Sequence, residues 1–278
     1  MKSVFYISIL LFTILTISCK EDTTEEVVPQ ILRLTKMSET SPIYDPSTHL
    51  FKYNQEGKLI EYNFQPGRYV SNEVDMHSYN SQGQLSEILS YDTKRSSSYL
   101  SKTTHTYNAS NQLIKLTRDE SGSYYAIDYN SQGNISEIRF YYDGSTTASQ
   151  WYILEYDSRG NMTSQKTYRS EQGKAAMLSQ HSIVEYDDKP NPFHKLGSPL
   201  LRSYGQNSIL EGFLIGSLSP NNPTKVELRM YLQQSGQVME WVKTINYLYK
   251  YGAGNLPIEI TYSNSMGVNV QTLEYAVQ

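Results

Sequence analysis

Apolar and polar residues alternate along the segments that lead up to a series of tyrosines. The position two residues before each tyrosine is mostly apolar, and the position directly before it is polar. The first set comprises Phe51, His77, His105, Ile127, Leu154, Val184 and Tyr249, and the second comprises Lys52, Ser78, Thr106, Asp128, Glu155, Glu185 and Lys250. A period of two residues is typical of a β-strand with one face toward a core. The pattern therefore predicts a series of half-buried strands.

A turn signal follows five tyrosines of this series. The units begin at Tyr53, Tyr79, Tyr107, Tyr129 and Tyr156, and degenerate copies begin at Tyr186 and Tyr251. Asn or Asp stands directly after each tyrosine of the five, and both residues favour the start of a type I turn. Three residues after this Asn or Asp, the chain needs a positive φ, which Gly adopts readily and Asn tolerates. The residues expected at these structural turn positions are Gly57, Gly83, Asn111, Gly133 and Gly160.

The spacing of the units defines the expected fold class. They recur roughly every 22 to 30 residues, as in repeat proteins in which each unit is one supersecondary element. Because each unit has the signature of a β-hairpin, we expect an all-β fold, an elongated antiparallel sheet of consecutive β-hairpin repeats. Apolar residues after the turns lie three positions apart, as at Leu85 and Ile88, which predicts a bulge or a change of buried face.

One stretch interrupts the series. Tyr186 begins a unit, but Pro190 and Pro192 stand where the turn should be. Proline cannot donate to a strand ladder, so the sheet is expected to be broken or capped here. Apolar residues then fall near helical spacing with several glycines among them, which predicts a short, partly helical insertion near residues 194–218.

The N-terminus predicts export and a lipid anchor. An apolar run from residue 4 to residue 17 is too short to span a bilayer as a helix. The residues Leu-Thr-Ile-Ser stand directly before Cys19, which is the only Cys of the chain. This five-residue sequence resembles a bacterial lipobox. We therefore predict a lipoprotein signal peptide over residues 1–19 with lipidation at Cys19, an acidic flexible tether over 20–30, and a single β-repeat domain over 31–278. An ordinary signal peptide or a short membrane anchor is the alternative.

The residues after the cysteine indicate a location. Lys20, Glu21 and Asp22 resemble the export signal that sends Bacteroidetes lipoproteins to the outer face of the outer membrane. The expected location is the outer membrane, lipid-anchored and at the cell surface, with the periplasmic face as the alternative. The membrane is then a partner through the lipid anchor.

The Tyr-Asn/Asp-x-x-Gly-x-Leu units resemble the YD repeats of the RHS family. The lipobox, the run at residues 186–193 and the run at residues 219–225 are more similar to uncharacterised Bacteroidetes lipoproteins with degenerate YD-like repeats. The resemblance covers roughly residues 31 to 278. It implies an all-β meandering sheet and no particular activity. The self-cleaving core segment of the large RHS proteins is absent, so their role in enclosing a toxin is not carried over.

Composition narrows the range of functions. The formal net charge of −4 argues against a nucleic-acid surface. Tyr is abundant at 25 residues, against 7 Phe and 2 Trp. Its ring suits a half-buried pleated surface, and its hydroxyl is expected to reach water at the edge of the sheet. Gly-rich phosphate loops, nucleophile elbows and His-Glu-x-x-His motifs do not occur, so no cofactor and no catalytic or metal-binding residue is assigned.

Two columns of ionisable residues offer weak candidates for chemistry. Glu61, Glu87 and Glu137 stand eight residues after their tyrosines, with Lys115 in that place in the third unit. Two such carboxylates could run glycoside hydrolysis or bind Ca²⁺, but a solvated outward column is the simpler interpretation.

Histidines form the second column. His77 and His105 share one repeat position and could ligate a metal. The same position is apolar in most other units, so two half-buried packing residues are the simpler interpretation.

Paired aromatic residues are the remaining candidates for a site. The possible ligand-binding aromatics are Tyr124, Tyr125, Tyr141, Tyr142, Trp151 and Tyr152. Successive side chains of a strand point to opposite faces, so one ring of each pair must point away from the apolar column. Exposed rings in a row suit stacking against sugar rings or against a partner's side chains. The sequence therefore favours a non-catalytic binding or scaffold module for a glycan or an envelope protein, with a glycoside hydrolase as the alternative.

Overall fold

The computed structural model describes residues 31–42, 44–67, 72–93, 100–170, 176–196, 217–234, 237–264 and 267–277. Ile31–Gln278 form one compact unit, which contains every described strand. The predicted signal peptide, Cys19, the tether and the residues Lys20, Glu21 and Asp22 lie outside the described residues. So does the segment 197–216, and with it most of the predicted helical insertion.

Antiparallel β-strands make up almost the whole of the described structure. The strands are β1 (Leu32–Thr40), β2 (Ser47–Tyr53), β3 (Leu59–Gln65), β4 (Glu73–Tyr79), β5 (Leu85–Asp92), β6 (Ser101–Tyr107), β7 (Leu113–Arg118), β8 (Tyr124–Tyr129), β9 (Ile135–Tyr141), β10 (Gln150–Tyr156), β11 (Met162–Arg169), β12 (Met177–Pro190), β13 (Asn221–Gln234), β14 (Gln237–Tyr251), β15 (Pro257–Asn264) and β16 (Gly267–Val277). A short 3-10 helix, η1 (Ala253–Asn255), joins β14 to β15. The predicted all-β antiparallel class is confirmed.

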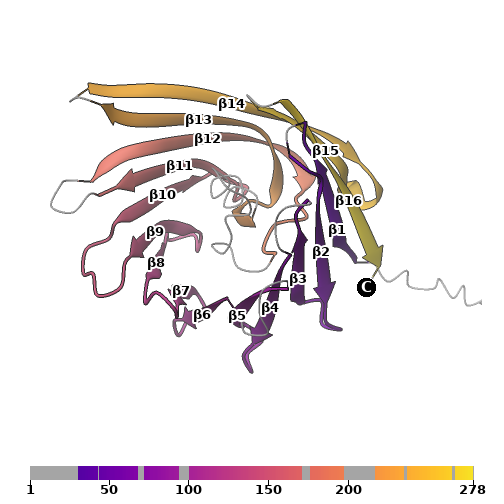
Figure 1. Cartoon of the computed structure of the whole chain (residues 1–278), viewed down its shortest axis with the longest axis horizontal. Coiled ribbons are helices and arrows are strands. Elements are labelled where there is room, and N and C mark those ends of the chain that lie inside the picture. The colour runs from indigo at the N-terminus through magenta and orange to yellow at the C-terminus, as the bar shows by residue number, and fades with distance from the viewer. Residues whose placement is uncertain are drawn as a thin grey trace, which may run out of the picture. The chain divides into compact units, whose positions relative to one another are not determined.

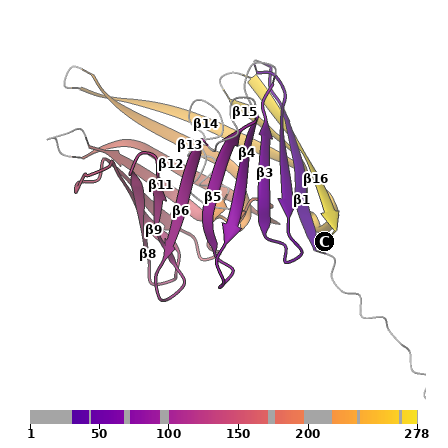
Figure 2. The same ribbon diagram turned by 60° about the horizontal axis from the view of Figure 1, so that its bottom comes forward.

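The sheet closes into a barrel (Figure 1). Each strand pairs with the next strand of the chain, and β1 pairs with β16, for example through Met37 and Leu273. Figure 2 shows β3 to β6 side by side along one part of the wall. The predicted elongated sheet is therefore wrong. Local pattern specifies the hairpins, but whether the two end strands meet depends on twist accumulated over all sixteen strands.

Bulges add to that twist, because each extra residue bends its strand. The β4–β5 ladder shifts register between Ser78 and Tyr79, so that Tyr79 pairs with Leu85 while Ser78 pairs with Glu87. The β2–β3, β6–β7, β8–β9 and β10–β11 hairpins shift at the equivalent place. This accounts for the three-residue spacing of apolar residues after the turns.

The turns before these bulges share one geometry. Gly57, Gly83, Gly133 and Gly160 have φ of 77°, 76°, 81° and 85°, and Asn111 has φ of 62°. In the second unit, Asn80 Oδ1 accepts hydrogen bonds from the backbone N–H groups of Gln82 and Gln84 at 3.1 and 2.9 Å. The Asn at the start of the unit therefore holds the turn, and the residue three positions later supplies the left-handed backbone.

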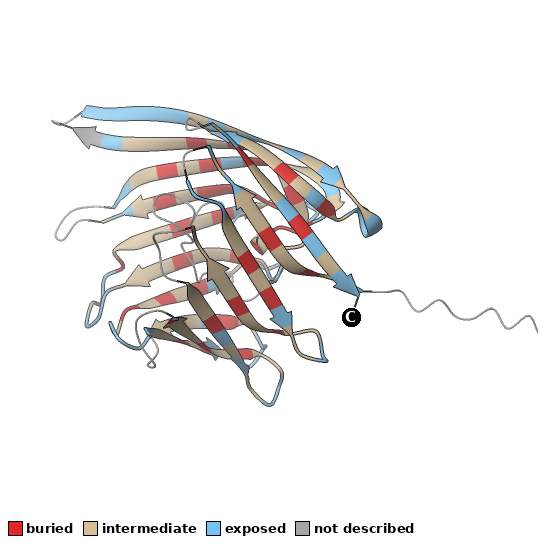
Figure 3. Ribbon diagram, turned by 45° about the vertical axis from the view of Figure 1, so that its right-hand side comes forward, coloured by how far each residue is buried: buried red, intermediate tan, exposed pale blue. Residues whose placement is uncertain are grey.

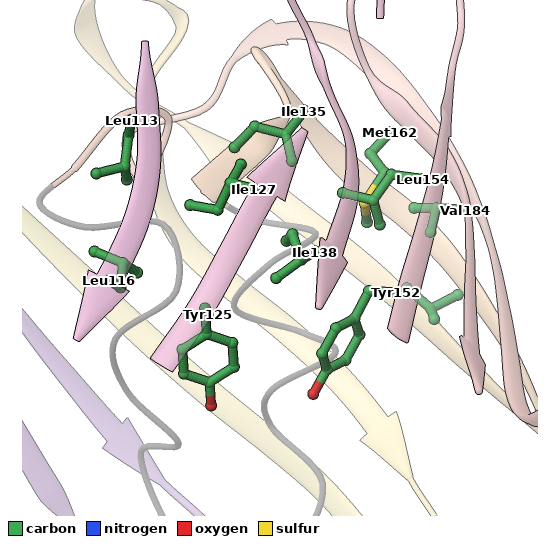
Figure 4. Close-up of a cluster of buried hydrophobic side chains, with 11 residues drawn as sticks. Leu113, Leu116, Tyr125, Ile127, Ile135, Ile138, Tyr152, Leu154, Met162 and Val184 are labelled. Atoms are coloured by element: carbon green, nitrogen blue, oxygen red, sulfur yellow. The ribbon is translucent and has the colours of Figure 1, made fainter. Parts of the chain in front are cut away.

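The inner face carries the core, in two clusters. The larger joins β7 to β13 and comprises Leu113, Leu116, Tyr125, Ile127, Ile135, Ile138, Tyr152, Leu154, Met162, Val184 and Val226 (Figure 4). The smaller joins β1 to β3 with β15 and β16 and comprises Leu34, Met37, Phe51, Leu59, Tyr62, Ile260 and Leu273. In the strands that lead up to the tyrosines, buried positions alternate with intermediate or exposed ones, as the sequence pattern predicted, whereas the strands after the turns have buried positions three apart (Figure 3).

A ring of tyrosine hydroxyls ties neighbouring hairpins together near the turn end of the barrel. Seven hydroxyls donate to a backbone carbonyl at the start of the preceding strand, at 2.6–2.9 Å: Tyr53 to Leu34, Tyr79 to Leu59, Tyr107 to Leu85, Tyr129 to Leu113, Tyr186 to Met162, Tyr249 to Pro223 and Tyr275 to Pro257. The sequence reasoning did not foresee these bonds to the backbone of a neighbouring strand. Burial raises the pKa of Tyr53 and of Tyr79 to about 12.

The connection between β12 and β13 attaches to both clusters. Phe193 and Leu196 pack against the smaller cluster, and Leu218 packs against the larger. The sheet was predicted to be broken or capped at the prolines. β12 continues to Pro190, which pairs with Asn221 of β13 after a shift in register, and the strand ends at this first proline. Asn222 compensates for the irregular ladder, since its side-chain amide donates to the carbonyls of Lys189 and Pro190 at 3.3 Å.

Candidate functional site

The outer face of the barrel carries a network of ion pairs, most of them between neighbouring strands. The pairs at 2.6–3.1 Å include Lys36–Glu274, Lys52–Glu61, Lys102–Glu87, Lys166–Glu155, Lys225–Glu185, Arg229–Glu227 and Lys250–Glu259. Exposed pairs of this kind contribute about 0–1 kcal/mol each to stability. They show chiefly that the outer wall is charged.

The carboxylate column lies within this network. Glu61 pairs with Lys52, Glu87 pairs with Lys102 at 2.6 Å, and Glu137 lies 3.5 Å from Nε of Arg139. The three residues come from β3, β5 and β9, and none of them lines either of the two cavities found beside the described rim. The structure thus places them on the outer wall and does not gather them around a concave site.

The histidine column lies inside the barrel. His77 is half-buried and His105 is buried, on β4 and β6. Burial, with a smaller contribution from His77, lowers the pKa of His105 to about 4. His49, which the sequence reasoning passed over, also faces inward and lies 2.5 Å from the hydroxyl of Tyr62. In the described part of the chain, no group of three or more His, Cys, Asp or Glu is placed to hold a metal ion.

The predicted aromatic residues divide between the two faces. Tyr125 and Tyr152 are buried in the larger cluster, at 8% and 4% exposed. Tyr142 lies just beyond the end of β9, is 62% exposed, and packs edge-on against Phe140 at 5.1 Å between ring centroids. The rings of Tyr125 and Tyr152 are therefore part of the core, and only rings on the outer face are available to a ligand.

The outer rings form a strip over β8 to β11. Tyr124 and Tyr141 stack at 4.7 Å with an interplanar angle of 9°, and Nζ of Lys115 lies 4.2 Å from the Tyr124 centroid. Both faces of Tyr124 are thus occupied. Trp151 is half-buried and pairs across the ladders with Arg139 and with Tyr168, which the sequence reasoning did not single out. Within the described structure neither Trp151 nor Tyr168 makes a ring contact, so these two rings are the members of the strip without an aromatic or cationic partner.

Two cavities lie beside the segment 192–196 at the turn end of the barrel. One, of about 310 Å³, is lined among others by Arg33, Lys58 and Lys195. The other, of about 510 Å³, is lined among others by Arg159 and Lys195. The sequence reasoning missed both. Lys58 offered a signal, because the same place in the other units holds Gln84, Gln112, Asn134 and Asn161.

Comparisons with known proteins bear on the fold. No protein-family model matches the chain, and no curated protein matches it. Among solved structures, a porin-like protein from Bacteroides uniformis is similar over 90% of this chain and 99% of its own, with 12% identity and a TM-score of 0.54. At that identity the similarity shows the fold alone. In the described residues, no helix is long and apolar enough to cross a membrane.

Two further structures align with lower scores. A porin-like protein from Bacteroides vulgatus gives 13% identity and a TM-score of 0.43, over 88% of this chain and 99% of its own. The TcdB2-TccC3 structure gives 16% identity and a TM-score of 0.35, over 84% of this chain and 10% of its own. Scores below 0.5 do not establish a shared fold, so the resemblance to RHS repeats stays a prediction from the sequence.

Proposed function

We propose that this protein is a lipid-anchored barrel of the bacterial outer membrane that faces water and binds a glycan through its outer aromatic strip, without catalysis. The observation that carries the binding proposal is Trp151, an outward, half-buried ring without a ring partner in the described structure. The barrel's fold similarity to a porin-like protein is consistent with a protein of the cell envelope.

The outer wall favours water over lipid as its surroundings. A barrel that spans a membrane presents an apolar outer band about 25 Å tall, and Lys or Arg on that face costs about 2–4 kcal/mol at the bilayer midplane. Here the outer face carries ion pairs such as Lys52–Glu61, Lys166–Glu155 and Lys225–Glu185 on strands spread around the barrel. We therefore assign membrane attachment to the acylated Cys19 and not to the wall.

Removal of the acylated thiol tests this assignment. Acyl chains contribute about 0.8 kcal/mol per buried CH₂, and stable anchoring requires more than one chain. We expect wild-type protein in the membrane fraction and the Cys19→Ala protein either unprocessed or released. As a matched control, residues 1–19 are replaced by a cleavable signal peptide without a lipobox, which should give a protein soluble without detergent. Membrane retention of that processed control would contradict the water-facing wall.

Protease shaving tests the cell-surface location separately. If Lys20, Glu21 and Asp22 direct the protein outward, protease added to intact cells should cleave it. Resistance on intact cells together with cleavage after lysis would place it on the periplasmic face instead.

Stacking explains why the outer strip suits a sugar. Trp151, Tyr141 and Tyr168 are half-buried on three neighbouring strands, and charged neighbours such as Arg139 and Lys166 surround them. Ring faces beside polar side chains match a ligand with an apolar face and polar edges. The neighbouring carboxylates are engaged in ion pairs and line neither of the two cavities beside the described rim, which is why we assign binding and not hydrolysis.

The two tryptophans allow a direct test of glycan binding. Trp241 is 56% exposed on β14, away from the strip, so Trp241→Phe leaves Trp151 as the sole tryptophan. On titration with an array of neutral and acidic oligosaccharides, that variant should change its fluorescence with any glycan that the wild type binds. The matched Trp151→Phe variant should not respond, and Trp151→Ala should weaken binding by about 1–3 kcal/mol. An array without any bound glycan, or a glycan bound equally well by Trp151→Ala, would refute the site.

A further inference from the structure

The smaller cavity at the turn end is built from three separate parts of the chain. Arg33 comes from β1, Lys58 from the β2–β3 turn, and His194 and Lys195 from the segment after β12. Its volume is about 310 Å³, at the lower end of the range of small-ligand sites. The rings of Tyr53, Tyr79 and Tyr275 contribute to its lining.

The charge of this lining is positive. The described lining residues include Arg33, Lys58 and Lys195 and no carboxylate. His194 adds no charge near neutral pH, because burial and the neighbouring Lys195 lower its pKa. Glu56 pairs with Lys58 at 2.6 Å, but its side chain is 69% exposed and it does not belong to the lining. An excess of cationic groups therefore faces the cavity.

Two of these cations are positioned by the repeat. The guanidinium of Arg33 lies 5.5 Å from the Tyr53 centroid, and Nζ of Lys58 lies 5.4 Å from the Tyr79 centroid. Each of the two cationic groups also lies close to the glycine of a turn. A Cβ added at Gly57 would lie 1.9 Å from Nη2 of Arg33, and one added at Gly83 would lie 2.6 Å from Nζ of Lys58.

This arrangement is confined to one arc of the rim. At Gly133 and Gly160 an added Cβ would meet nothing within 4 Å. The cavity on that side is lined by Arg159, which pairs with Asp157 at 3.4 Å, as Lys58 pairs with Glu56, but which also donates to the carbonyl of Asp187 at 2.9 Å. A cation that followed the turn in every unit would be a property of the repeat. Lys58 is instead a lysine where the other units have Gln or Asn, and this difference marks a site.

We propose that the cavity between Arg33, Lys58 and Lys195 binds a small organic anion of about the size of a monosaccharide, with a carboxylate, sulfate or phosphate group. Arg33 supplies a planar fork of donors, and the two lysines supply point charges. The rings of Tyr53 and Tyr79 support the cations and provide apolar surface for the rest of the ligand. This site is independent of the aromatic strip, from which it differs in both position and chemistry.

The test uses the full-length protein in detergent at low ionic strength. Calorimetric titrations compare inorganic phosphate, sulfate, glucuronate, glucose 6-phosphate and uncharged glucose. At least one anion should bind and glucose should not, and the pattern among the anions distinguishes the carboxylate, sulfate and phosphate chemistries. Affinity should fall with added salt.

Matched lysine substitutions locate the site. Lys58→Gln, which introduces the residue found at positions 84 and 112, should weaken anion binding at least tenfold without changing the melting temperature measured in the absence of anion. Lys195→Gln should weaken it as well and serves as a second variant. Lys52→Gln removes an ion-paired lysine on the outer wall of the same hairpin and should bind as the wild type does. No binding of any anion, equal binding of glucose, or wild-type affinity in both cavity variants would overturn the proposal.

Discussion

The short strands from β2 to β11 and the long hairpin of β13 and β14 use the same alternation of side chains with different results. The short strands have six to eight residues, and their inward residues are largely buried. β13 and β14 have 14 and 15 residues, and residues 237–245 of β14 extend past the end of β15, which pairs with β14 only from Asn246 onward. On the projecting part, Leu232, Val238, Trp241 and Val242 are 55–67% exposed although they belong to both faces.

Length relative to the barrel explains this difference. At the base of the hairpin, Ile245 and Tyr247 pack against the larger cluster, which spans β7 to β13. Nearer the tip, the two strands still pair in register from Lys225–Asn246 to Gln234–Gln237. Pairing supplies the backbone hydrogen bonds at the tip, but it supplies no second layer to cover the side chains. Alternation along a strand therefore predicts burial only where the sheet encloses something.

Truncation in the core should show the largest contrast between the two regions. Ile138 is fully buried, so Ile138→Ala should lower the free energy of unfolding by about 2–5 kcal/mol. Val242 is 58% exposed on the hairpin, so the isosteric Val242→Thr should change the free energy of unfolding by less than about 0.5 kcal/mol. Urea denaturation of both variants checks the contrast. A comparable loss in Val242→Thr would mean that the hairpin is covered in solution.

Acid should destabilise the enclosed wall through His105. Its pKa is about 4 in the folded protein and about 6.5 when unfolded, so between these values only the unfolded chain binds the proton. Stability is therefore fully present above about pH 6.5 and should fall by on the order of 3 kcal/mol as the pH drops to about 4.

His105→Leu isolates this contribution, because the equivalent position in other units holds Ile127 and Leu154. The variant should lose less stability than the wild type over that pH window when both are measured by urea denaturation. Identical pH profiles would show that His105 does not titrate abnormally.

The hydrogen bonds of the tyrosine hydroxyls should stabilise the short-strand wall and the base of the long hairpin equally. Each bond should contribute less than a buried core side chain does. Tyr129→Phe removes the bond to the Leu113 carbonyl in the wall, and Tyr249→Phe removes the bond to the Pro223 carbonyl at the base of the hairpin. Each should cost about 0.5–1.5 kcal/mol in thermal or urea unfolding. Tyr156 is the matched control: among the described residues its buried hydroxyl has no hydrogen-bond partner, so Tyr156→Phe should be neutral or stabilising. Equal losses at Tyr129 and Tyr156 would refute the role of these hydrogen bonds.

The candidate sites were predictable to different degrees. Alternation at Tyr124–Tyr125 and Trp151–Tyr152 was enough to expect one ring on each face, because side-chain direction along a strand is local. It could not show that Tyr141 and Lys115 cover both faces of Tyr124, which depends on register between three strands. The rim cavity brings together residues 33, 58 and 195, and such a grouping exists only after the chain has closed and the β12–β13 connection has attached to it.

The sequence by itself determined the local elements of this protein. Tyrosine, the Asn or Asp after it and the Gly or Asn three positions later specify hairpins, because turn geometry and strand alternation depend on a few adjacent residues. Closure of the sheet, the acceptors of the tyrosine hydroxyls and the exposure of the long hairpin were decided only in three dimensions. Closure depends on the accumulated twist of many strands, the tyrosine acceptors depend on register with the adjacent strand, and the exposure of the hairpin depends on what packs against it. None of these can be read from a single repeat.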